Sequence, residues 1–513
     1  MSFLRPATLS RVGRVALLVF FAWLAGRFWH PYYGFTRFLQ MDEDSRAHTL
    51  PELRPAPIFT YADGYDGHYY AQLAARPAVD DPALGGAIDN VGYRARRILL
   101  SWTAWVAGGG DPVAAVRAYA WLNLVIWAGL AALLWRIFPG PGWRDNVAWA
   151  GILFSAGVLH GVRLALTEPL ALLLIAGATV LAERNRRNPA AALLGLGGLA
   201  RETVVLGAVT LLPAGRTTRP GWLKTAGRLA LVATPLALWL VHLRSVPGPA
   251  ESGARNFMLP FAGWATKWAQ VVRQMSTEPD RYLALTTLLA HLALTVQAAW
   301  LMVRRQPSDP WWRLGAVHAG LMLCLSMAVW EGHPGASTRV LLPLALAFNV
   351  LAVRGSASWV WLGLGNLSVL SGVLTLWTVP PGARELAAGR GAAGAYVVHT
   401  DARWYAVEAG RTRNWAWCAH EGGIQVDFLP RADGTVNLQV AVRSITARPL
   451  EIRQAGRVLW HGDIGEKIQW VTLSGVTVTA GHAELAFVSP APPVKESAGG
   501  RDLGFAVYGV RIE

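Results

Sequence analysis

The sequence predicts a mostly α-helical polytopic membrane protein, with about 10 to 12 transmembrane segments, followed by a C-terminal all-β sandwich domain. Its 513 residues are 53% hydrophobic and 15% charged and include 25 tryptophans, a composition outside the range of soluble domains of this length. Apolar segments long enough to cross about 30 Å of hydrocarbon recur as far as residue 378. Beyond residue 395 apolar and polar residues alternate, which is typical of β-strands.

The apolar segments define a transmembrane domain over residues 1–380 with a large first loop at residues 30–112. Residues 189–212 differ from the other segments, because Arg201-Glu202 interrupts the apolar sequence and basic residues flank both ends. Two short helices that meet at Arg201-Glu202 would return the chain to the same side, and irregular backbone at membrane depth is tolerated where it lines a cavity. The remaining spans are expected at residues 11–29, 113–138, 146–162, 164–183, 227–243, 282–303, 313–330, 336–353 and 357–378.

The positive charge is spread over short clusters between the apolar segments, and the formal net charge is +15. Such clusters mark the cytoplasmic ends of spans and contact lipid phosphates, whereas nucleic-acid-binding proteins gather basic residues on one face. We therefore expect membrane lipids and no nucleic acid among the partners. With residues 189–212 counted as a hairpin, the clusters put the N-terminus in the cytoplasm and the first loop on the outer face.

The C-terminal region changes its pattern after a linker expected at residues 381–395. Ile424, Val426 and Phe428 alternate with polar residues, and the same period of two recurs at residues 436–443, 485–487 and 505–507. Turn-forming glycine, Asp-Gly and proline residues separate these stretches. Residues 396–513 are therefore predicted to form an antiparallel β-sandwich on the outer face.

The first loop contains the most informative motif, DGYDGHYY at residues 63–70. An ionised carboxylate near a hydroxyl can act as a general base, so Asp66 is a candidate catalytic residue, and Asp63 can support it or ligate a metal with it. We expect Tyr65, His68 and Tyr69 of the same motif to contact substrate. The alternative is that the two Asp-Gly pairs only make turns and cap the following helix.

A second polar cluster follows in the same loop. Arg94, Arg96 and Arg97 precede an apolar segment that begins at Ile98. Forked guanidinium donors suit a phosphate or pyrophosphate group, so these arginines are candidate substrate-binding residues. Contact with ordinary lipid headgroups is the alternative.

Ionisable residues also occur within the apolar sequence, where they are costly and usually face a cavity or a partner. Glu168, Arg201 and Glu202 are of this kind, and His333 and Arg339 lie in a short turn between two expected spans. We expect these five residues to shape a substrate-binding cavity. The alternatives are that Glu168 forms a structural ion pair with Arg163 or Arg201, and that His333 is only a turn residue.

Together these residues suit group transfer from a phosphate-linked donor. A carboxylate would deprotonate an acceptor hydroxyl, while arginines would stabilise the charge that grows on the leaving phosphate. We assign no residue as a metal ligand and no certain cofactor, because the sequence has no dense acidic triad. A divalent cation such as Mg²⁺ or Mn²⁺ is a candidate, since Asp63 and Asp66 with Asp42 can supply oxygen ligands.

Several of these stretches resemble a group of bacterial membrane proteins related to the GT-C glycosyltransferases. The resemblance covers residues 10–380 and is carried by GYDGHYYAQLA at 64–74, DNVGYRARRIL at 89–99, LTEPL at 166–170, ARET at 200–203 and STRVLLP at 337–343. The chain departs from the family pattern at two places. It has His68 where the family has glutamine, and Asn90-Val91-Gly92 where the family has Pro-Ala. The Asp-Glu pair that follows the first span in the family is displaced here to Asp42-Glu43.

The resemblance implies an inverting sugar transfer from a polyprenyl-phosphate-linked donor, with the base in the first outer loop. Asp66 is the first candidate, and Asp63, Asp44 and Asp42 remain alternatives. The acceptor would be a cell-envelope glycan, lipid or protein. The protein would be a multi-pass protein of the bacterial inner membrane, with the first loop and the C-terminal domain in the periplasm. Its C-terminal region resembles the β-sandwich of some family members, in which Trp415 and Trp417 either hold acceptor glycan or belong to the core.

Two other function classes are compatible with the sequence. A lipid-linked glycan flippase or transporter would need polar residues through the middle of several spans, whereas here the ionisable groups cluster toward the outer ends. A non-catalytic glycan-binding assembly protein would have an inert first loop. Transport of labelled lipid between leaflets would favour the first alternative, and glycan binding without transferase activity would favour the second.

Overall fold

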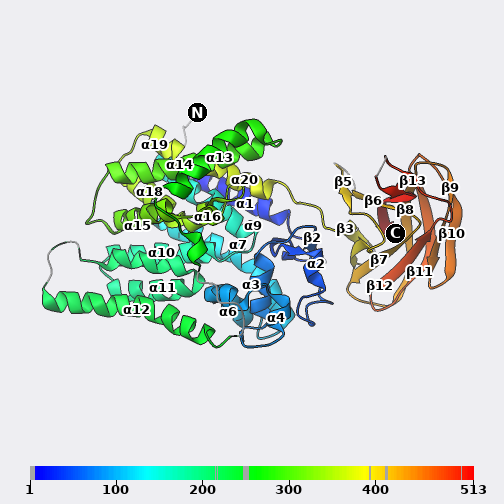
Figure 1. The fold of residues 1–513 in the computed structure, drawn as a ribbon, viewed down its shortest axis with the longest axis horizontal. Coiled ribbons are helices and arrows are strands. Elements are labelled where there is room, and N and C mark those ends of the chain that lie inside the picture. Colours follow the sequence, from blue (N-terminus) through cyan, green and yellow to red (C-terminus); the bar gives the residue numbers. More distant parts are fainter. Residues whose placement is uncertain are drawn as a thin grey trace. The chain divides into compact units, whose positions relative to one another are not determined.

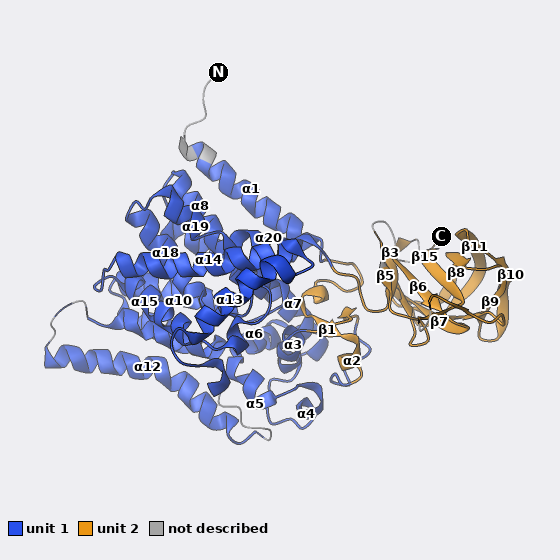
Figure 2. Ribbon diagram, turned by 45° about the horizontal axis from the view of Figure 1, so that its top comes forward, with its two compact units in different colours: residues 1–28, 48–56, 65–379 blue, residues 29–47, 57–64, 380–513 orange. Residues whose placement is uncertain are grey.

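The structure is a computed structural model, and it describes residues 6–213, 215, 218–246, 253–391, 394–410, 414–497 and 500–512. The chain forms two compact units (Figure 2). Unit 1 comprises residues 1–28, 48–56 and 65–379, and unit 2 comprises residues 29–47, 57–64 and 380–513. The expected first loop at residues 30–112 is therefore divided between the two units.

Unit 1 is helical (Figure 1). Its longer helices are α1 Pro6–Gly26, α3 Gly67–Ala75, α6 Leu99–Ala107, α7 Pro112–Ile137, α8 Trp143–Leu153, α9 Ala156–Arg163, α10 Glu168–Glu183, α11 Arg187–Ala200, η3 Glu202–Leu211, α12 Arg219–Leu243, α13 Ala262–Thr277, α14 Arg281–Val303, α15 Pro310–Cys324, α18 Leu342–Arg354 and α20 Ser368–Trp377. Its short helices are α4 Leu84–Ala87, α5 Val91–Arg94, η2 Ala95–Arg97, η4 Ala254–Asn256, α16 Met327–Trp330, α17 Ser337–Val340 and α19 Trp359–Leu364.

Four helical stretches among the described residues are long and apolar enough to cross a membrane, namely Pro112–Ile137, Arg219–Leu243, Arg281–Val303 and Trp359–Trp377. Each of them overlaps a span expected from the sequence. The expected total of about 10 to 12 spans is not supported.

Some of the other expected spans are interrupted by residues that end or restart a helix, whereas those expected at 11–29 and 164–183 correspond to the continuous helices α1 and α10. The span expected at 146–162 divides at Ser155, whose side chain accepts a hydrogen bond from the Val158 amide at the start of α9. The span expected at 313–330 divides at Leu325, and Pro343 lies in the first turn of α18. The break expected at Arg201 is confirmed, because α11 ends at Ala200 and η3 begins at Glu202.

Unit 2 contains two antiparallel sheets. One has the order β10-β9-β12-β7-β4-β3 and the other β11-β8-β15-β6-β5. The strands are β3 Glu385–Gly391, β4 Gly394–Thr400, β5 Glu408–Ala409, β6 Asn414–Cys418, β7 Glu421–Leu429, β8 Gly434–Ser444, β9 Arg448–Gln454, β10 Arg457–Ile464, β11 Gln469–Val478, β12 His482–Val488 and β15 Phe505–Ile512, with a small pair β13 Val494–Lys495 and β14 Asp502–Leu503.

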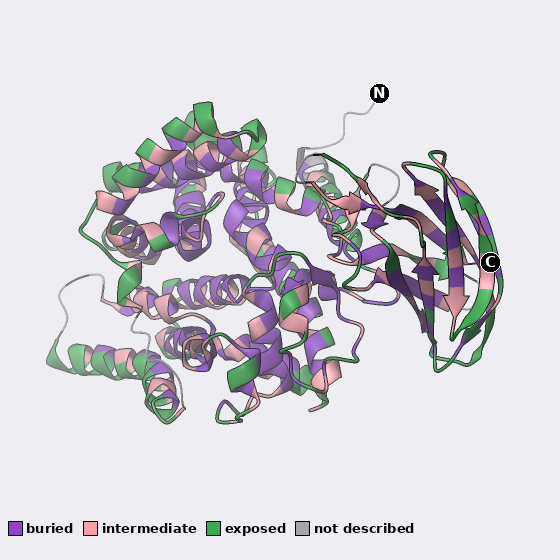
Figure 3. Ribbon diagram, turned by 45° about the vertical axis from the view of Figure 1, so that its right-hand side comes forward, coloured by how far each residue is buried: buried purple, intermediate pink, exposed green. Residues whose placement is uncertain are grey.

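One core joins the two sheets, and it confirms the alternation seen in the sequence. Ile424, Val426 and Phe428 of β7 are all buried in this core, and Phe505 and Val507 of β15 join them from the other sheet. The strands alternate between buried and more exposed residues (Figure 3). An all-β C-terminal region made of antiparallel sheets is therefore present, as the sequence predicts.

The first-loop segments of unit 2 pack on β4. Tyr33 and Phe59 form an apolar cluster with Val397, and the Tyr33 hydroxyl lies 2.6 Å from His399 Nε2. Burial, with a smaller contribution from the charge of Arg46, lowers the pKa of His399 to about 4, so its ring is neutral at pH 7. Residues 41–42 and 60–61 pair as the short parallel strands β1 and β2. This aromatic packing is why residues 29–47 and 57–64 belong to unit 2.

Strand β3 lies within the expected linker. It pairs with β4, for example between Ala388 and Val397, and its Leu386 is buried in the sandwich core. The expected linker at 381–395 thus contains a strand of the sheet, except at residues 392–393, which lie outside the described residues. The small side chains of Ala387, Ala388 and Gly389 gave this strand no clear alternating pattern.

Helix α9 approaches α17 closely at a glycine. A Cβ atom at Gly157 would lie 2.2 Å from the Thr338 carbonyl oxygen. We expect Gly157→Ala to separate the two helices and to lower the free energy of unfolding by about 1 to 3 kcal/mol. The thermal midpoint of the detergent-solubilised protein measures this change.

Gly227→Ala is the matched control. Gly227 lies within α12, and a Cβ atom there would meet nothing within 4 Å. Because alanine favours a helix over glycine, this variant should be neutral or stabilised by up to about 1 kcal/mol. Equal midpoints for the two variants would contradict the proposed close contact.

Candidate functional site

The DGYDGHYY motif runs into the start of α3. Asp66 occupies the N-cap position, but its backbone is already helical and its side chain makes no capping hydrogen bond. The motif is held by its own turn, in which His68 Nδ1 lies 2.8 Å from the Tyr65 carbonyl oxygen. The Asp66 carboxylate is therefore directed to other partners instead of capping the helix.

Arg94 is the principal partner of Asp66. Its Nη1 lies 2.7 Å from Asp66 Oδ2, while its Nε and Nη2 donate to the two oxygens of Asp89 at 2.9 and 2.7 Å. The guanidinium also lies over the rings of Tyr69, at 4.9 Å, and Tyr93, at 5.5 Å. The position of the Arg94 guanidinium is thus held by two carboxylates and two aromatic rings, and Arg94 in turn holds the Asp66 carboxylate in place.

The surroundings of Asp89 also favour its ionised form. Burial raises the pKa of this carboxyl, but the hydrogen bonds and the charge of Arg94 outweigh burial, so the pKa of Asp89 lies below its usual value. The same contacts raise the pKa of Arg94 above its usual value, although burial opposes them. Both groups therefore stay charged across the physiological pH range.

Two further motif residues bind arginines that are distant in the sequence. The Tyr65 hydroxyl accepts a hydrogen bond from Arg339 Nη2 at 2.8 Å, and the Tyr70 hydroxyl accepts one from Arg97 Nη1 at 3.1 Å. Arg339 lies on α17 and Arg97 on η2. The motif thus helps to position guanidinium groups from two other helices.

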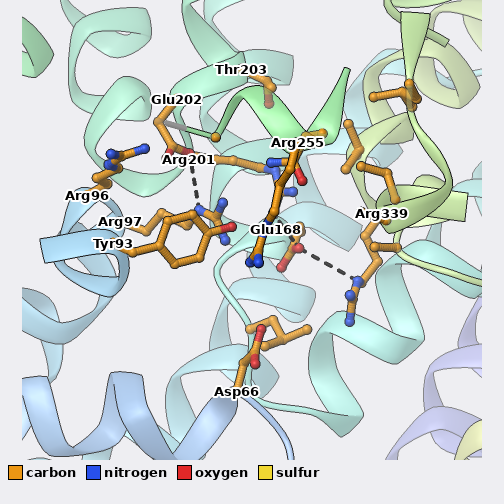
Figure 4. A pocket seen from close by; sticks show the side chains of 18 of the residues that line it. Asp66, Tyr93, Arg96, Arg97, Glu168, Arg201, Glu202, Thr203, Arg255 and Arg339 are labelled. Carbon is orange, nitrogen blue, oxygen red and sulfur yellow. Dashed lines mark hydrogen bonds and ion pairs between the residues drawn. The ribbon is translucent and has the colours of Figure 1, made fainter. Parts of the chain in front are cut away.

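Glu168 binds two arginines at the start of α10. Its carboxylate forms an ion pair with Arg201 and lies 3.7 Å from Arg339 Nε (Figure 4). The Glu168 side chain is only 6% exposed. Glu202 forms a similar pair with Arg97, at 3.1 Å. Of the two ion pairs considered from the sequence, Glu168 with Arg201 is the one that the structure contains.

These groups line a cavity of about 550 Å³ in unit 1. One part of its wall is rich in guanidinium groups, and another part, from Phe257 to Val329, is largely apolar. Asp66 projects into the same cavity (Figure 4). The charged lining residues are Asp66, Arg96, Arg97, Glu168, Arg201, Glu202, Arg255, Glu331 and Arg339, and the apolar ones include Phe257, Leu321, Leu325, Ala328 and Val329.

The structure brings most of the residues expected at the site together. The expected site residues that line the cavity are Tyr65, Asp66, Arg96, Arg97, Glu168, Arg201, Glu202 and Arg339. Arg94 does not line the cavity, but it forms the ion pair with Asp66, and the Tyr69 ring packs against the Arg94 guanidinium. His68 and His333 are not among the lining residues. His68 is buried within its turn, and His333 Nδ1 lies 3.1 Å from the Thr287 hydroxyl. Asp63 is exposed and belongs to unit 2.

Sequence reasoning missed three lining residues that matter for the chemistry. Arg255 enters from η4, between α12 and α13, while Tyr93 and Phe257 contribute aromatic rings. A single arginine just before the apolar stretch Phe257–Leu259 was the available signal for Arg255. This arginine resembled the basic residues in other loops of the chain, so the sequence did not distinguish it as a cavity residue.

The described residues do not assemble a ready metal site, since none of them form a group of three or more histidine, cysteine or acidic side chains within reach of one ion. Asp42 instead caps the short helix α2 Glu43–Arg46, accepting from the Ser45 amide at 2.6 Å and the Ser45 hydroxyl at 2.7 Å. One carboxylate of the ligand set considered from the sequence, that of Asp42, is thus engaged in capping α2.

Comparison with known proteins adds no family assignment. No protein-family model matches the chain. No curated protein matches it either.

The carboxylate of Glu168 is expected to be important for stability. In Glu168→Gln, the buried guanidinium groups of Arg201 and Arg339 would lose their shared negative partner. Removing one member of a buried ion pair typically costs about 3 to 5 kcal/mol. We expect a loss of about this size, seen as a lower thermal midpoint in detergent.

Glu183→Gln provides the control, because Glu183 pairs with Arg354 at a position where the two side chains are 34% and 42% exposed. Exposed pairs contribute less than about 1 kcal/mol. If Glu168→Gln were as stable as Glu183→Gln, the ion pairs of Glu168 would be of little energetic importance.

Proposed function

We propose that the protein is a membrane glycosyltransferase of the GT-C type. It transfers a sugar from a polyprenyl-phosphate-linked donor to a cell-envelope acceptor, with inversion at the anomeric carbon. The observation that carries this proposal is one cavity that combines an arginine-rich wall, an apolar wall and the Asp66 carboxylate. A lipid phosphate needs the first two features, and a displacement at the adjoining sugar needs the third.

The charge of the cavity suits a phosphate. Five arginines line it, against four carboxylates, and two of those carboxylates are already paired with lining arginines. Guanidinium groups donate in pairs to phosphate oxygens and keep their charge at any physiological pH. An anionic phosphate would thus relieve the repulsion between neighbouring arginines, while the apolar wall would contact the first prenyl units.

The proposed reaction is a single displacement. The acceptor oxygen attacks the anomeric carbon, the bond from that carbon to the phosphate oxygen breaks, and Asp66 receives the acceptor's proton. The electron pair leaves with the polyprenyl phosphate, whose charge the lining arginines stabilise. Arg94 holds Asp66 by one oxygen, Oδ2, at 2.7 Å, which leaves Oδ1 to accept the proton.

The proposed setting is the bacterial inner membrane, with the site on the periplasmic side. The four helices long and apolar enough to cross a membrane support a membrane location. The sidedness rests on the basic clusters between the apolar segments.

Asp66→Asn tests the assignment of the base. We expect transfer to fall by about 10²- to 10⁴-fold, because the amide cannot accept the hydroxyl proton. The assay follows labelled hexose from polyprenyl phosphate into a washed cell-envelope fraction, using purified protein in nanodiscs. Asp80→Asn, at an exposed loop aspartate, is the matched control. Asp63→Asn distinguishes the two motif carboxylates, since a greater loss with it than with Asp66→Asn would move the base to Asp63.

Arg255→Gln tests the lipid-phosphate part of the proposal independently of catalysis. We expect the affinity for polyprenyl phosphate to fall at least about tenfold, because a charged donor is lost from the cavity wall. Native mass spectrometry of the protein with added polyprenyl phosphate measures this binding. Arg244→Gln is the control, since Arg244 is exposed at the end of α12 and does not line the cavity. Equal affinities for the two variants would speak against a phosphate on this wall.

A further inference from the structure

One carboxylate of the cavity in unit 1 differs from the others in its partners. Three of the four acidic lining residues form ion pairs with arginines, namely Asp66 with Arg94, Glu168 with Arg201 and Glu202 with Arg97. The fourth, Glu331, forms no ion pair with any residue that the structure describes, and it is exposed. Because Glu331 is exposed and also lines the cavity, it lies where the cavity opens to solvent.

Glu331 begins a short turn that connects two parts of the cavity wall. It follows α16, whose Ala328 and Val329 belong to the apolar wall, and the turn leads to α17, which carries Arg339. Ala336, near the end of the turn, also lines the cavity. Along the chain, Glu331 thus stands at the junction of the apolar wall and the arginine-rich wall.

The turn is closed tightly by its own backbone. Gly335 has a φ of +100°, and an added Cβ atom there would lie 2.7 Å from the Trp330 carbonyl oxygen and 2.8 Å from that of Glu331. Trp330 is fully buried, so the start of the turn is anchored in unit 1. The contact of His333 with the Thr287 hydroxyl of α14 anchors its middle. The backbone that carries Glu331 therefore has little freedom.

A buried lysine holds the same turn. Lys267 of α13 is 0% exposed, and its Nζ donates to the Gly332 carbonyl oxygen at 3.1 Å. Burial lowers the pKa of Lys267, and the charge of Glu331 opposes this shift, so the two groups interact electrostatically. Lysine is almost never fully buried unless it is paired. The position of the 331–335 turn is what this costly side chain determines.

The chemistry of an unpaired carboxylate limits what it can bind. Such a group does not suit the phosphate of a donor, because like charges repel. It suits hydroxyl groups, since both carboxylate oxygens accept and form short, strong hydrogen bonds with O–H donors. Neutral sugars offer such hydroxyls on adjacent carbons. A uronic acid would instead bring a second carboxylate toward Glu331.

We propose that Glu331 binds hydroxyl groups of the transferred sugar, that Lys267 positions it through the 331–335 turn, and that the sugar is consequently neutral and not a uronic acid. This inference rests on the proposed function, because it assumes a polyprenyl-phosphate-linked sugar in the cavity. Glu331 takes no part in bond making or breaking, in which Asp66 receives the proton. Lys267 acts through the turn and does not touch substrate.

The test compares polyprenyl phosphate with polyprenyl-phosphate hexoses by native mass spectrometry of the full-length protein in detergent. The hexose lipids are those of glucose, mannose and galactose, and the one that the wild type binds most tightly is used. We expect Glu331→Gln to weaken binding of this hexose lipid at least about tenfold, because a charged acceptor is lost. Binding of polyprenyl phosphate, which lacks the sugar, should stay unchanged.

Glu484→Gln is the matched control. Glu484 is an exposed glutamate of β12, and it has no ion pair within the described part of the chain. The same chemical change at this position should alter neither affinity.

A uronic acid lipid tests the effect of charge. The wild type should bind polyprenyl-phosphate glucuronate at least about tenfold more weakly than the hexose lipid, because two carboxylates repel each other. Glu331→Gln should reduce this difference.

Lys267→Met tests the positioning residue. It should weaken the hexose lipid and leave polyprenyl phosphate unchanged. Combined with Glu331→Gln it should add less than about twofold, because both changes act on one contact. A merely structural role of Lys267 would weaken both lipids, and its effect would add to that of Glu331→Gln.

The outcomes separate this inference from the proposed function. If the wild type binds neither polyprenyl phosphate nor a hexose lipid, both fail. The inference alone is overturned if polyprenyl phosphate binds but Glu331→Gln leaves the hexose lipid unchanged or weakens both lipids equally. It is also overturned if the glucuronate lipid binds as tightly as the hexose lipid. Should Lys267→Met fail to fold, the comparison of Glu331→Gln with Glu484→Gln still decides.

Discussion

The ion pairs of Glu168 are the constraint on which the helical unit's site depends. A carboxylate that is 6% exposed is costly unless cations surround it, and here Arg201 and Arg339 do so. These residues come from α10, from the break after α11 and from α17, so one carboxylate draws together three distant segments. The electrostatic requirement of Glu168 therefore gathers guanidinium groups at a single cavity wall.

The DGYDGHYY motif completes this arrangement by hydrogen bonding. Tyr65 accepts from Arg339 and Tyr70 from Arg97, while Asp66 is held by Arg94. A guanidinium has five donors, so it can satisfy a tyrosine or carboxylate of the protein and still donate to a ligand. Some donors of the network remain unused, since Arg201 Nε and Arg339 Nε have no hydrogen-bond partner within the described part of the chain.

Local patterns in the sequence were enough for some features and not for others. The alternation at Ile424, Val426 and Phe428 identified core positions of β7, because side-chain direction in a strand has a fixed period. Arg201 indicated a helix break for an equally local reason, because the charged pair Arg201-Glu202 interrupts an apolar stretch. The division of the first loop was not predictable, since it depends on Tyr33 packing against β4 across more than 350 positions of the chain. Arg255 was missed because its place in the cavity depends on tertiary structure.

Arginine has different partners in the two units, and the difference follows from the surroundings. In the helical unit the guanidinium groups of Arg97 and Arg201 lie at low exposure, so the carboxylates of Glu202 and Glu168 balance them. In the β unit Arg511 lies over the half-exposed ring of Trp470, where water screens its charge and no carboxylate is needed. The exposure of a guanidinium thus decides whether the fold must supply a carboxylate beside it.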